Sequence, residues 1–306
     1  MNYTENTLEL YAISELEKSG WTHKHGQQLP EDWRAGTSEV IFGSHIHHAI
    51  SRLNPQLPSD KVEVIAGEVL RQIRQFDNAD LAHKNRRFYD LLKNGVPVSF
   101  THEGEQRSEF VRLIDFQTVT NNRFDVINQL VIKGKRQNRK PDILLYVNGL
   151  PLVIMELKNP FNASVSITEA YQQLQTYQDD IADVFIYNQL QIISEGNLAR
   201  VGSLTADFER FSPWRVVDES VHRQLDFEME IDALLCHLLN PATLLDYVQN
   251  FIVFEQDGTG GIAKKCGIYH QYYAVNQAIQ CTKRATTTDG KIGVVWHTQG
   301  SGKSLS

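Results

Sequence analysis

The stretch PDILLYVNGLPLVIMELKNP, residues 141–160, decides how this chain folds. Two apolar runs, 143–147 and 152–157, are joined by Asn148-Gly149, the dipeptide most typical of a tight β-hairpin. The second run is apolar at every position, which is typical of a central strand buried on both faces. The sequence therefore predicts a hairpin whose second strand lies inside the protein.

Charged residues end this apolar strand. Glu156 and Lys158 are two positions apart, so they share a face of the strand, and burying them without a partner is costly. Asp142, at the start of the first strand, can supply a second carboxylate. Two carboxylates and a lysine suit metal-assisted phosphodiester hydrolysis, because carboxylates bind Mg²⁺ and a lysine can orient the attacking water. A purely structural ion pair at a strand end is the alternative, and the spacing alone favours neither.

The register of the hairpin tests the nuclease hypothesis. A plain two-residue turn pairs Val147 with Leu150 and brings Asp142 opposite Met155, which leaves Glu156 on the other face. A three-residue loop, or a single β-bulge, pairs Asp142 with Glu156 instead. The hypothesis therefore predicts an irregular hairpin, and a regular two-residue hairpin would exclude it.

Two flanking features favour a site that binds DNA. A basic cluster precedes Asp142, and the alternative for it is a solvated loop. The cluster consists of Lys133, Lys135, Arg136, Arg139 and Lys140. In the helix expected at 166–180, Gln173 and Tyr177 are four residues apart and can point at the same phosphate or metal-bound water.

A phosphate loop is predicted near the end of the chain. The sequence HTQGSGKS, residues 297–304, follows an apolar strand expected at 292–296, although the full pattern has glycine where His297 stands. The predicted ATP-binding residues are Gly300, Ser301, Gly302, Lys303 and Ser304. The chain stops two residues later, before the acidic residue and arginine that ATP hydrolysis needs, so we expect a fragment that does not hydrolyse ATP by itself.

The remaining pattern predicts the organisation of the chain. Further helices are expected at 5–19, 60–94, 221–249 and 269–284, strands at 109–116, 123–132 and 184–194, and a loop at 255–261. The 306 residues suffice for about two domains. We expect a nuclease domain over 1–215, a mainly helical linker over 216–260 and the start of an ATPase domain over 261–306.

Composition limits the class of protein. The net charge of −7 argues against coating DNA through bulk positive charge, so DNA binding requires a local patch. There are three cysteines without a CxxC pair, no secretory leader and no apolar run of the roughly 20 residues that span a bilayer. These features predict a reduced, cytoplasmic protein without a membrane segment.

These motifs together resemble a known family. Pro141-Asp142, thirteen intervening residues, Glu156-Leu157-Lys158 and then Gln173-x-x-x-Tyr177 resemble the PD-(D/E)xK nuclease superfamily. The wider string NQLVIKGKRQNRKPDILLYVNGLPLVIMELKNP, residues 128–160, resembles the restriction subunit of type I restriction-modification enzymes. WHTQGSGKS, residues 296–304, is similar to helicase motif I of superfamily 2 translocases, and again to that subunit.

The resemblance implies a fold and a set of roles. The fold is α/β, with a PD-(D/E)xK core of a mixed sheet flanked by helices, then a helical linker and the first strand and phosphate loop of a RecA-like motor domain. Asp142 and Glu156 bind the metal with the Leu157 carbonyl, Lys158 positions the attacking water, and Gln173 and Tyr177 orient metal-bound water or the DNA backbone. Glu9 in the first helix joins the site, with Glu15 a weaker candidate, and Gln271 belongs to an adenine-reading segment.

The resemblance also implies cofactors and partners. Double-stranded DNA would be cut with Mg²⁺, and ATP with Mg²⁺ would drive the motor. Modification and specificity subunits would be partners and would bring S-adenosylmethionine. The alternatives are a stand-alone PD-(D/E)xK nuclease, a type III-like restriction subunit, and a DNA-binding and docking module whose nuclease centre is vestigial.

Overall fold

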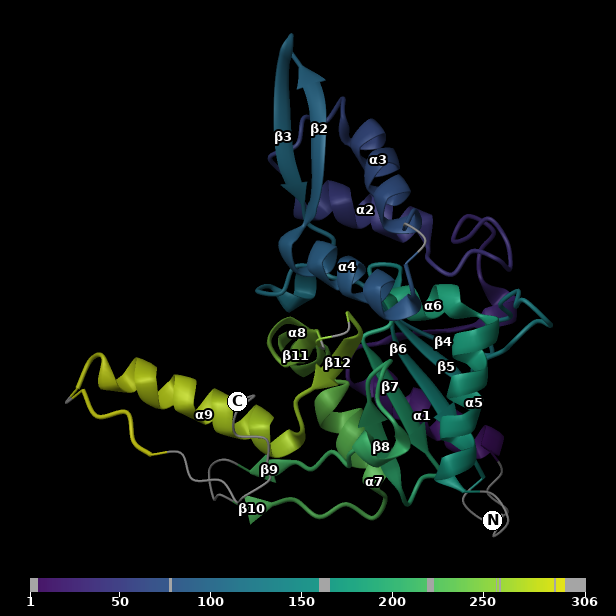
Figure 1. Ribbon diagram of the computed structural model, residues 1–306, viewed down its shortest axis with the longest axis vertical. Helices are drawn as coiled ribbons and strands as arrows, with labels where there is room; N and C mark the ends of the chain where they lie inside the picture. Colours follow the sequence, from purple (N-terminus) through teal and green to yellow (C-terminus); the bar gives the residue numbers. More distant parts are fainter. Residues whose placement is uncertain are drawn as a thin grey trace.

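A mixed six-stranded sheet forms the centre of the protein, with strand order β1-β4-β5-β6-β7-β8 (Figure 1). The computed structural model describes residues 5–76, 79–159, 166–218, 223–256, 258, 260–288 and 290–294. The strands of the sheet are β1 (Thr22–His25), β4 (Phe124–Asn128), β5 (Ile143–Val147), β6 (Leu150–Leu157), β7 (Leu190–Ser194) and β8 (Ala199–Gly202). Pairing is parallel for β1–β4 and β6–β7 and antiparallel for the other neighbours. The α/β class with helices flanking a mixed sheet is confirmed.

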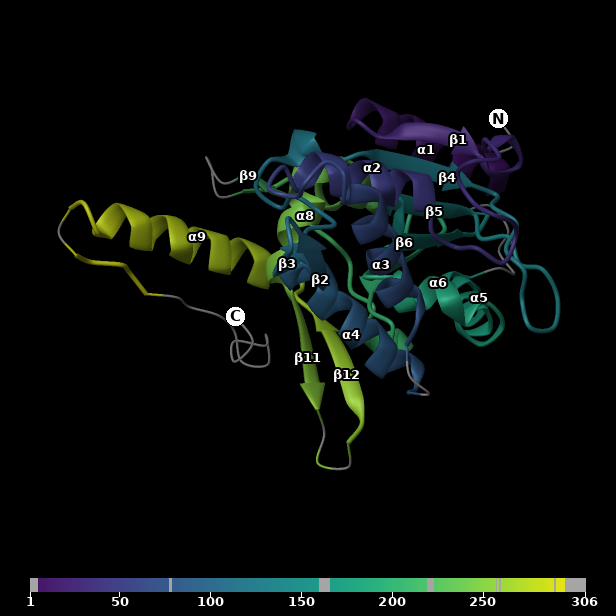
Figure 2. The same ribbon diagram turned by 90° about the horizontal axis from the view of Figure 1, so that it is seen from above.

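Helices cover both faces of this sheet (Figure 2). Helix α1 (Glu5–Lys18) packs on one face, and α5 (Ile167–Asp180) and α6 (Ala182–Tyr187) pack on the other. Every residue of β4, β5, β6 and β7 is buried, as expected for strands covered on both sides. The prediction that the second strand of the hairpin is central and buried is confirmed.

The β5–β6 hairpin has a tight turn and one bulge. Asn148 and Gly149 both have positive φ, of 51° and 87°, which is the requirement of a two-residue type I′ turn. Val147 pairs with Leu150 and Tyr146 with Pro151, but Leu145 then pairs with Val153, so one extra residue is accommodated in β6. Beyond the bulge Ile143 pairs with Met155, which puts Asp142 opposite Glu156. The predicted irregularity of this hairpin is confirmed.

A helical insertion with its own hairpin stands beside the sheet (Figure 1). It comprises α2 (Gly43–Leu53), α3 (Val62–Arg74), α4 (Leu81–Asn94), β2 (Val96–His102) and β3 (Glu105–Val111). The helix expected over 60–94 is confirmed in α3 and α4, with an interruption before Asp80, whose side chain accepts a hydrogen bond from the His83 backbone amide and caps α4. The strand expected at 184–194 begins only at Leu190, since the preceding apolar residues form α6.

The C-terminal third begins beside the insertion and the end of the sheet, and its last helix projects away from both (Figure 2). Its elements are β9 (Val217–Asp218), β10 (Arg223–Gln224), α7 (Glu230–Ala233), a π-helical turn η4 (Leu234–Leu238), α8 (Pro241–Asn250), β11 (Ile252–Gln256), β12 (Ile262–Cys266) and α9 (Tyr269–Ala285). Short 3₁₀ turns are η1 (Gly26–Gln28), η2 (Val119–Asn121) and η3 (Phe208–Arg210). The helix expected at 269–284 is confirmed, whereas helix within 221–249 starts only at Glu230.

Two further expectations concern the end of the chain. Strands β11 and β12 form one antiparallel hairpin that spans residue 260, the expected boundary between the linker and the ATPase domain. The division into three domains stays a prediction. Residues 291–294 are not part of a strand, and the phosphate loop lies outside the described residues. Among the helices of the described ranges, none is long and apolar enough to cross a membrane.

Candidate functional site

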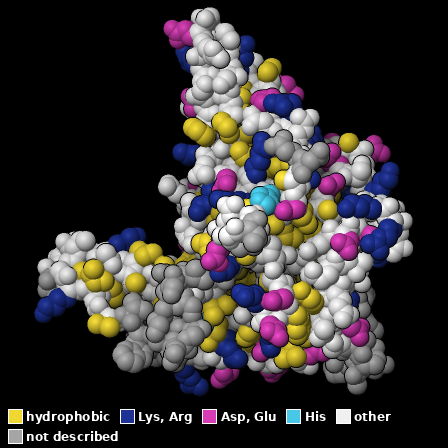
Figure 3. Space-filling model, viewed as in Figure 1, with side chains coloured by type: hydrophobic (Ala, Val, Ile, Leu, Met, Phe, Trp, Pro, Cys, Tyr) yellow, Lys and Arg dark blue, Asp and Glu magenta, His cyan; other side chains and the backbone are white. Residues whose placement is uncertain are grey.

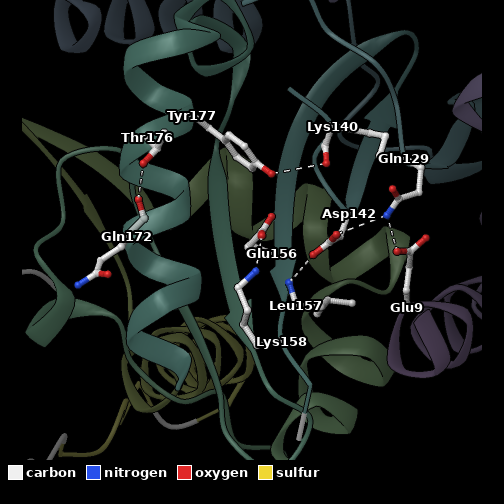
Figure 4. Close-up of polar contacts among 10 residues, drawn as sticks. All are labelled: Glu9, Gln129, Lys140, Asp142, Glu156, Leu157, Lys158, Gln172, Thr176 and Tyr177. Carbon is white, nitrogen blue, oxygen red and sulfur yellow. Dashed lines mark hydrogen bonds and ion pairs between the residues drawn. The ribbon is translucent and has the colours of Figure 1, made fainter. Parts of the chain in front are cut away.

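The strand ends at the β5–β6 hairpin bring the predicted acidic and basic groups together. Asp142 and Glu156 are buried, with 6% and 3% of their surfaces exposed. Lys158 Nζ lies 2.6 Å from Glu156 Oε1, so the two side chains share a face as the two-residue spacing predicts (Figure 4). The bulge thus places two carboxylates and one ammonium group at a single point on the sheet.

Asp142 is held from two neighbouring segments. Its Oδ2 accepts a 2.8 Å hydrogen bond from the Leu157 backbone amide. Its backbone carbonyl accepts a 3.0 Å bond from the amide of Gln129, the residue that follows β4. The Asp142 side chain is therefore fixed against the end of β6 rather than pointing into solvent.

Helix α1 brings Glu9 to the same place. Glu9 is 3% exposed, and its two carboxylate oxygens accept 2.6 Å hydrogen bonds from Asn128 Nδ2 and Gln129 Nε2. Gln129 Nε2 also lies 3.4 Å from Asp142 Oδ1 (Figure 4). Glu15, the other candidate, forms an ion pair with exposed Lys18 instead. Of the two glutamates, it is Glu9 that lies beside Asp142.

Helix α5 covers the site from the other side. Tyr177 is buried and its hydroxyl donates a 3.5 Å hydrogen bond to the Lys140 carbonyl. Burial raises the pKa of Tyr177 well above its usual value, the negative charges of Glu156 and Asp142 raise this pKa further, and a hydrogen bond with Gln173 lowers it. The four-residue spacing thus brings Gln173 and Tyr177 together. Figure 4 shows Gln172 on the other side of the helix, pointing away from the site.

The basic cluster divides into two groups. Asp180 is buried, and its carboxylate pairs with Arg139 Nε at 2.7 Å and with Arg136 Nε at 3.1 Å. Lys133, Lys135 and Lys140 are exposed. Arg139 and Arg136 therefore anchor the loop to the end of α5. Arg136 and the three lysines face solvent, whereas Arg139 is largely covered.

The carboxylates suit a metal that keeps most of its water. Among the described residues, no group of three or more His, Cys, Asp or Glu side chains is arranged to hold a metal ion. Mg²⁺ commonly uses only one or two protein carboxylates, with water and substrate phosphate completing its octahedron. Asp142 and Glu156, buried on one face with hard oxygen donors, fit that requirement.

Some predicted residues lie elsewhere, and some contacts were not predicted. Gln271 is in the first turn of α9, where its side chain accepts a 2.9 Å hydrogen bond from the Ile268 amide and caps the helix. Asn128, Gln129 and Asp180 were missed. The polar pair Asn128-Gln129 at the end of an apolar strand is the signal that could have indicated the first two.

Two family models and several relatives match this chain. Residues 2–210 match the family model of the type I restriction enzyme R protein N terminus, and residues 270–306 match that of the SWI2/SNF2 ATPase. The chain is 46% identical over 99% of its length to the type I restriction enzyme HindI endonuclease subunit of Haemophilus influenzae. It is 30% identical over 98% of its length to the MjaIXP endonuclease subunit assigned in Methanocaldococcus jannaschii.

These matches identify the class of protein as a restriction enzyme. The chain belongs to the type I restriction enzyme R protein family, and it matches the N-terminal part of that protein. It spans 29% of the length of the Haemophilus influenzae relative and 30% of the Methanocaldococcus jannaschii relative.

Proposed function

We propose that this chain carries the Mg²⁺-dependent nuclease centre of a type I restriction enzyme, which cleaves phosphodiester bonds in double-stranded DNA. The supporting observation is the bulged hairpin, because its register brings Asp142 opposite Glu156 with Lys158 in contact. A structural ion pair alone does not require a second buried carboxylate at this point of the sheet.

The proposed roles follow from position and chemistry. Bound Mg²⁺ would polarise the scissile phosphate and acidify a water. Asp142, Glu156 and the Leu157 carbonyl are the proposed ligands. Lys158, whose ammonium group lies beside Glu156, is proposed to orient the attacking water and to offset developing negative charge. Gln173 and Tyr177, one turn apart on α5, would orient metal-bound water or the DNA backbone, and Glu9 would add a third carboxylate beside Asp142.

DNA is proposed to approach over the loop that precedes Asp142. Lys133, Lys135 and Lys140 are exposed there and can neutralise phosphates. The ion pairs of Arg136 and Arg139 with Asp180 hold the loop in place, and both arginines remain candidates for phosphate contacts. Figure 3 shows Lys and Arg interspersed with Asp and Glu over the face in view, in keeping with the net charge of −7. Binding through a local cluster fits this distribution better than binding through the whole surface.

The rest of the assembly is proposed from the family. Gly300, Ser301, Gly302, Lys303 and Ser304 would bind ATP with Mg²⁺, and Gln271 would read the adenine. Modification and specificity subunits would be the partners, and S-adenosylmethionine would be bound through them. The nuclease domain would cover 1–215, the linker 216–260 and the beginning of the motor 261–306.

Calorimetric titration of Mn²⁺ tests the proposed centre. We expect the wild-type chain to bind Mn²⁺, the Asp142→Ala variant to lose at least tenfold in affinity, and the exposed control Asp90→Ala to bind as the wild type does. Binding that survives unchanged in Asp142→Ala would move the metal elsewhere and leave a structural ion pair at this hairpin. Mn²⁺ and DNA binding without cleavage in the assembled enzyme would identify a vestigial centre.

A further inference from the structure

Gln129 has an unusual backbone conformation at the edge of the proposed centre. Its φ of 53° lies in the left-handed region, which residues with a side chain adopt infrequently because of steric crowding. Such conformations persist where the surroundings impose them, and they concentrate at functional sites. Here the turn after β4 directs the Gln129 backbone amide at the Asp142 carbonyl, at 3.0 Å.

The same turn places the Gln129 side chain between two acidic groups. Its Nε2 donates a 2.6 Å hydrogen bond to Glu9 Oε2 and lies 3.4 Å from Asp142 Oδ1 (Figure 4). An amide nitrogen carries two hydrogens, one for each carboxylate. Without a donor between them, two buried carboxylates this close would repel each other.

We propose that Gln129 is a positioning residue that links Glu9 to Asp142 and holds the Asp142 carboxylate in the orientation needed to bind the metal. This inference rests on the proposed nuclease function. Glu9 then acts on the centre through the Gln129 amide, while its other oxygen is anchored by Asn128 at 2.6 Å. Groups that orient a metal ligand in this way typically contribute 10–100-fold to metal affinity.

The Gln129→Met variant removes the amide and keeps the length of the side chain and the same backbone constraint. We expect Mn²⁺ affinity, measured by calorimetry, to fall about tenfold. In a Glu9→Gln background the same substitution should have little further effect, because the link to Glu9 is already weakened. Gln172→Met, on the exposed side of α5, is the control and should leave affinity unchanged.

A second variant gives a readout without metal. Gln129→Glu places a third carboxylate against Glu9 and Asp142, so we expect the Tm of this variant in EDTA to lie several degrees below the wild-type Tm. Mn²⁺ should then raise the Tm of the variant by more than it raises the Tm of the wild type. This comparison decides the proposal even if Gln129→Met does not fold.

Three results would overturn the inference. They are wild-type Mn²⁺ affinity in Gln129→Met, an equal loss with and without Glu9→Gln, and a Gln129→Glu variant with the wild-type Tm in EDTA. The proposed function has its own test: if wild-type binding depends on Asp142 while Gln129→Met binds normally, only the positioning role fails. If the wild type binds no Mn²⁺, both proposals fail.

Discussion

At the scale of single residues, the Asn148-Gly149 turn shows why a local signal could be read from the sequence. Asn148 is buried, accepts a 2.8 Å hydrogen bond from the Arg123 amide and donates a 2.9 Å bond to the Leu113 carbonyl. Gly149 packs so closely that an added Cβ would lie 2.6 Å from the Phe42 carbonyl oxygen. The two residues thus satisfy both the turn and the packing beneath it.

Replacing Gly149 with alanine should destabilise the whole fold. The left-handed conformation costs a side chain about 1–2 kcal/mol, and the clash with the Phe42 backbone adds about 1–3 kcal/mol. We therefore expect the free energy of unfolding in urea to fall by roughly 2–5 kcal/mol. Gly67→Ala is the control, because Gly67 lies in α3 with nothing within 4 Å of an added Cβ. That control should gain up to about 1 kcal/mol, and an equal loss in both variants would contradict the argument.

Other residues of the site carried weaker signals. Glu9 could be predicted as a site residue only through the family resemblance, since a carboxylate on an amphipathic helix is ordinarily solvated. Gln129 was missed because its role depends on a left-handed turn and on a contact with a helix 120 positions away in the chain. Neither feature has a local sequence pattern, so the polar pair Asn128-Gln129 at the end of an apolar strand was the one local signal for this residue.

At the scale of elements, the β5–β6 hairpin shows what could be predicted and what could not. Counting residues established that Asp142 could face Glu156 only with one extra residue in the loop or strand. The structure accommodates that residue as a bulge between the Pro151 and Val153 pairs, and leaves the turn at two residues. A longer loop and a bulge both satisfy the residue count. Which of the two forms depends on packing, here on the close contact between Gly149 and Phe42.

The loop at 133–140 leads to a prediction at the scale of elements. Arg139 is held by buried Asp180 at the end of α5, whereas Lys133 and Lys135 are exposed. We expect Arg139→Ala to lower the free energy of unfolding by about 3 kcal/mol, because it leaves the Asp180 carboxylate incompletely paired. The double variant Lys133→Ala/Lys135→Ala should stay within about 0.5 kcal/mol of the wild type for each substitution.

DNA binding by the same variants tests the role of the lysines. If both contact phosphates, the double lysine variant should reduce the slope of log affinity against log salt concentration by about 2. Lys24→Ala, an exposed lysine in β1, is the charge-matched control and should leave the slope unchanged. A slope equal to that of the wild type in the double variant would show that these lysines are only solvated.

At the scale of the whole molecule, a buried lysine joins the C-terminal hairpin to the helical insertion and the central sheet. Lys264 of β12 is 2% exposed, and its Nζ donates to Asn85 Oδ1 at 2.9 Å, to the Asn188 carbonyl at 2.9 Å and to Gln189 Oε1 at 2.8 Å. These acceptors belong to α4 and to the segment that leads into β7. Side-chain contacts of one residue thus tie residues 252–266 to both the insertion and the sheet.

This junction makes a prediction about pH. Burial lowers the pKa of Lys264 from 10.5 to about 7 in the folded protein. Between these two values the unfolded chain binds more protons than the folded chain, so the contribution of Lys264 to stability rises with pH, by at most about 1.4 kcal/mol per pH unit.

Lys264→Met should be less stable than the wild type because three oxygen acceptors lose their donor. The difference in unfolding free energy between the two proteins should widen from pH 7 to pH 9. Urea unfolding at pH 7, 8 and 9 measures it, with exposed Lys24→Met as the control. A difference that stays constant would mean that the Lys264 ammonium group remains fully charged inside the fold, stabilised by its three oxygen neighbours.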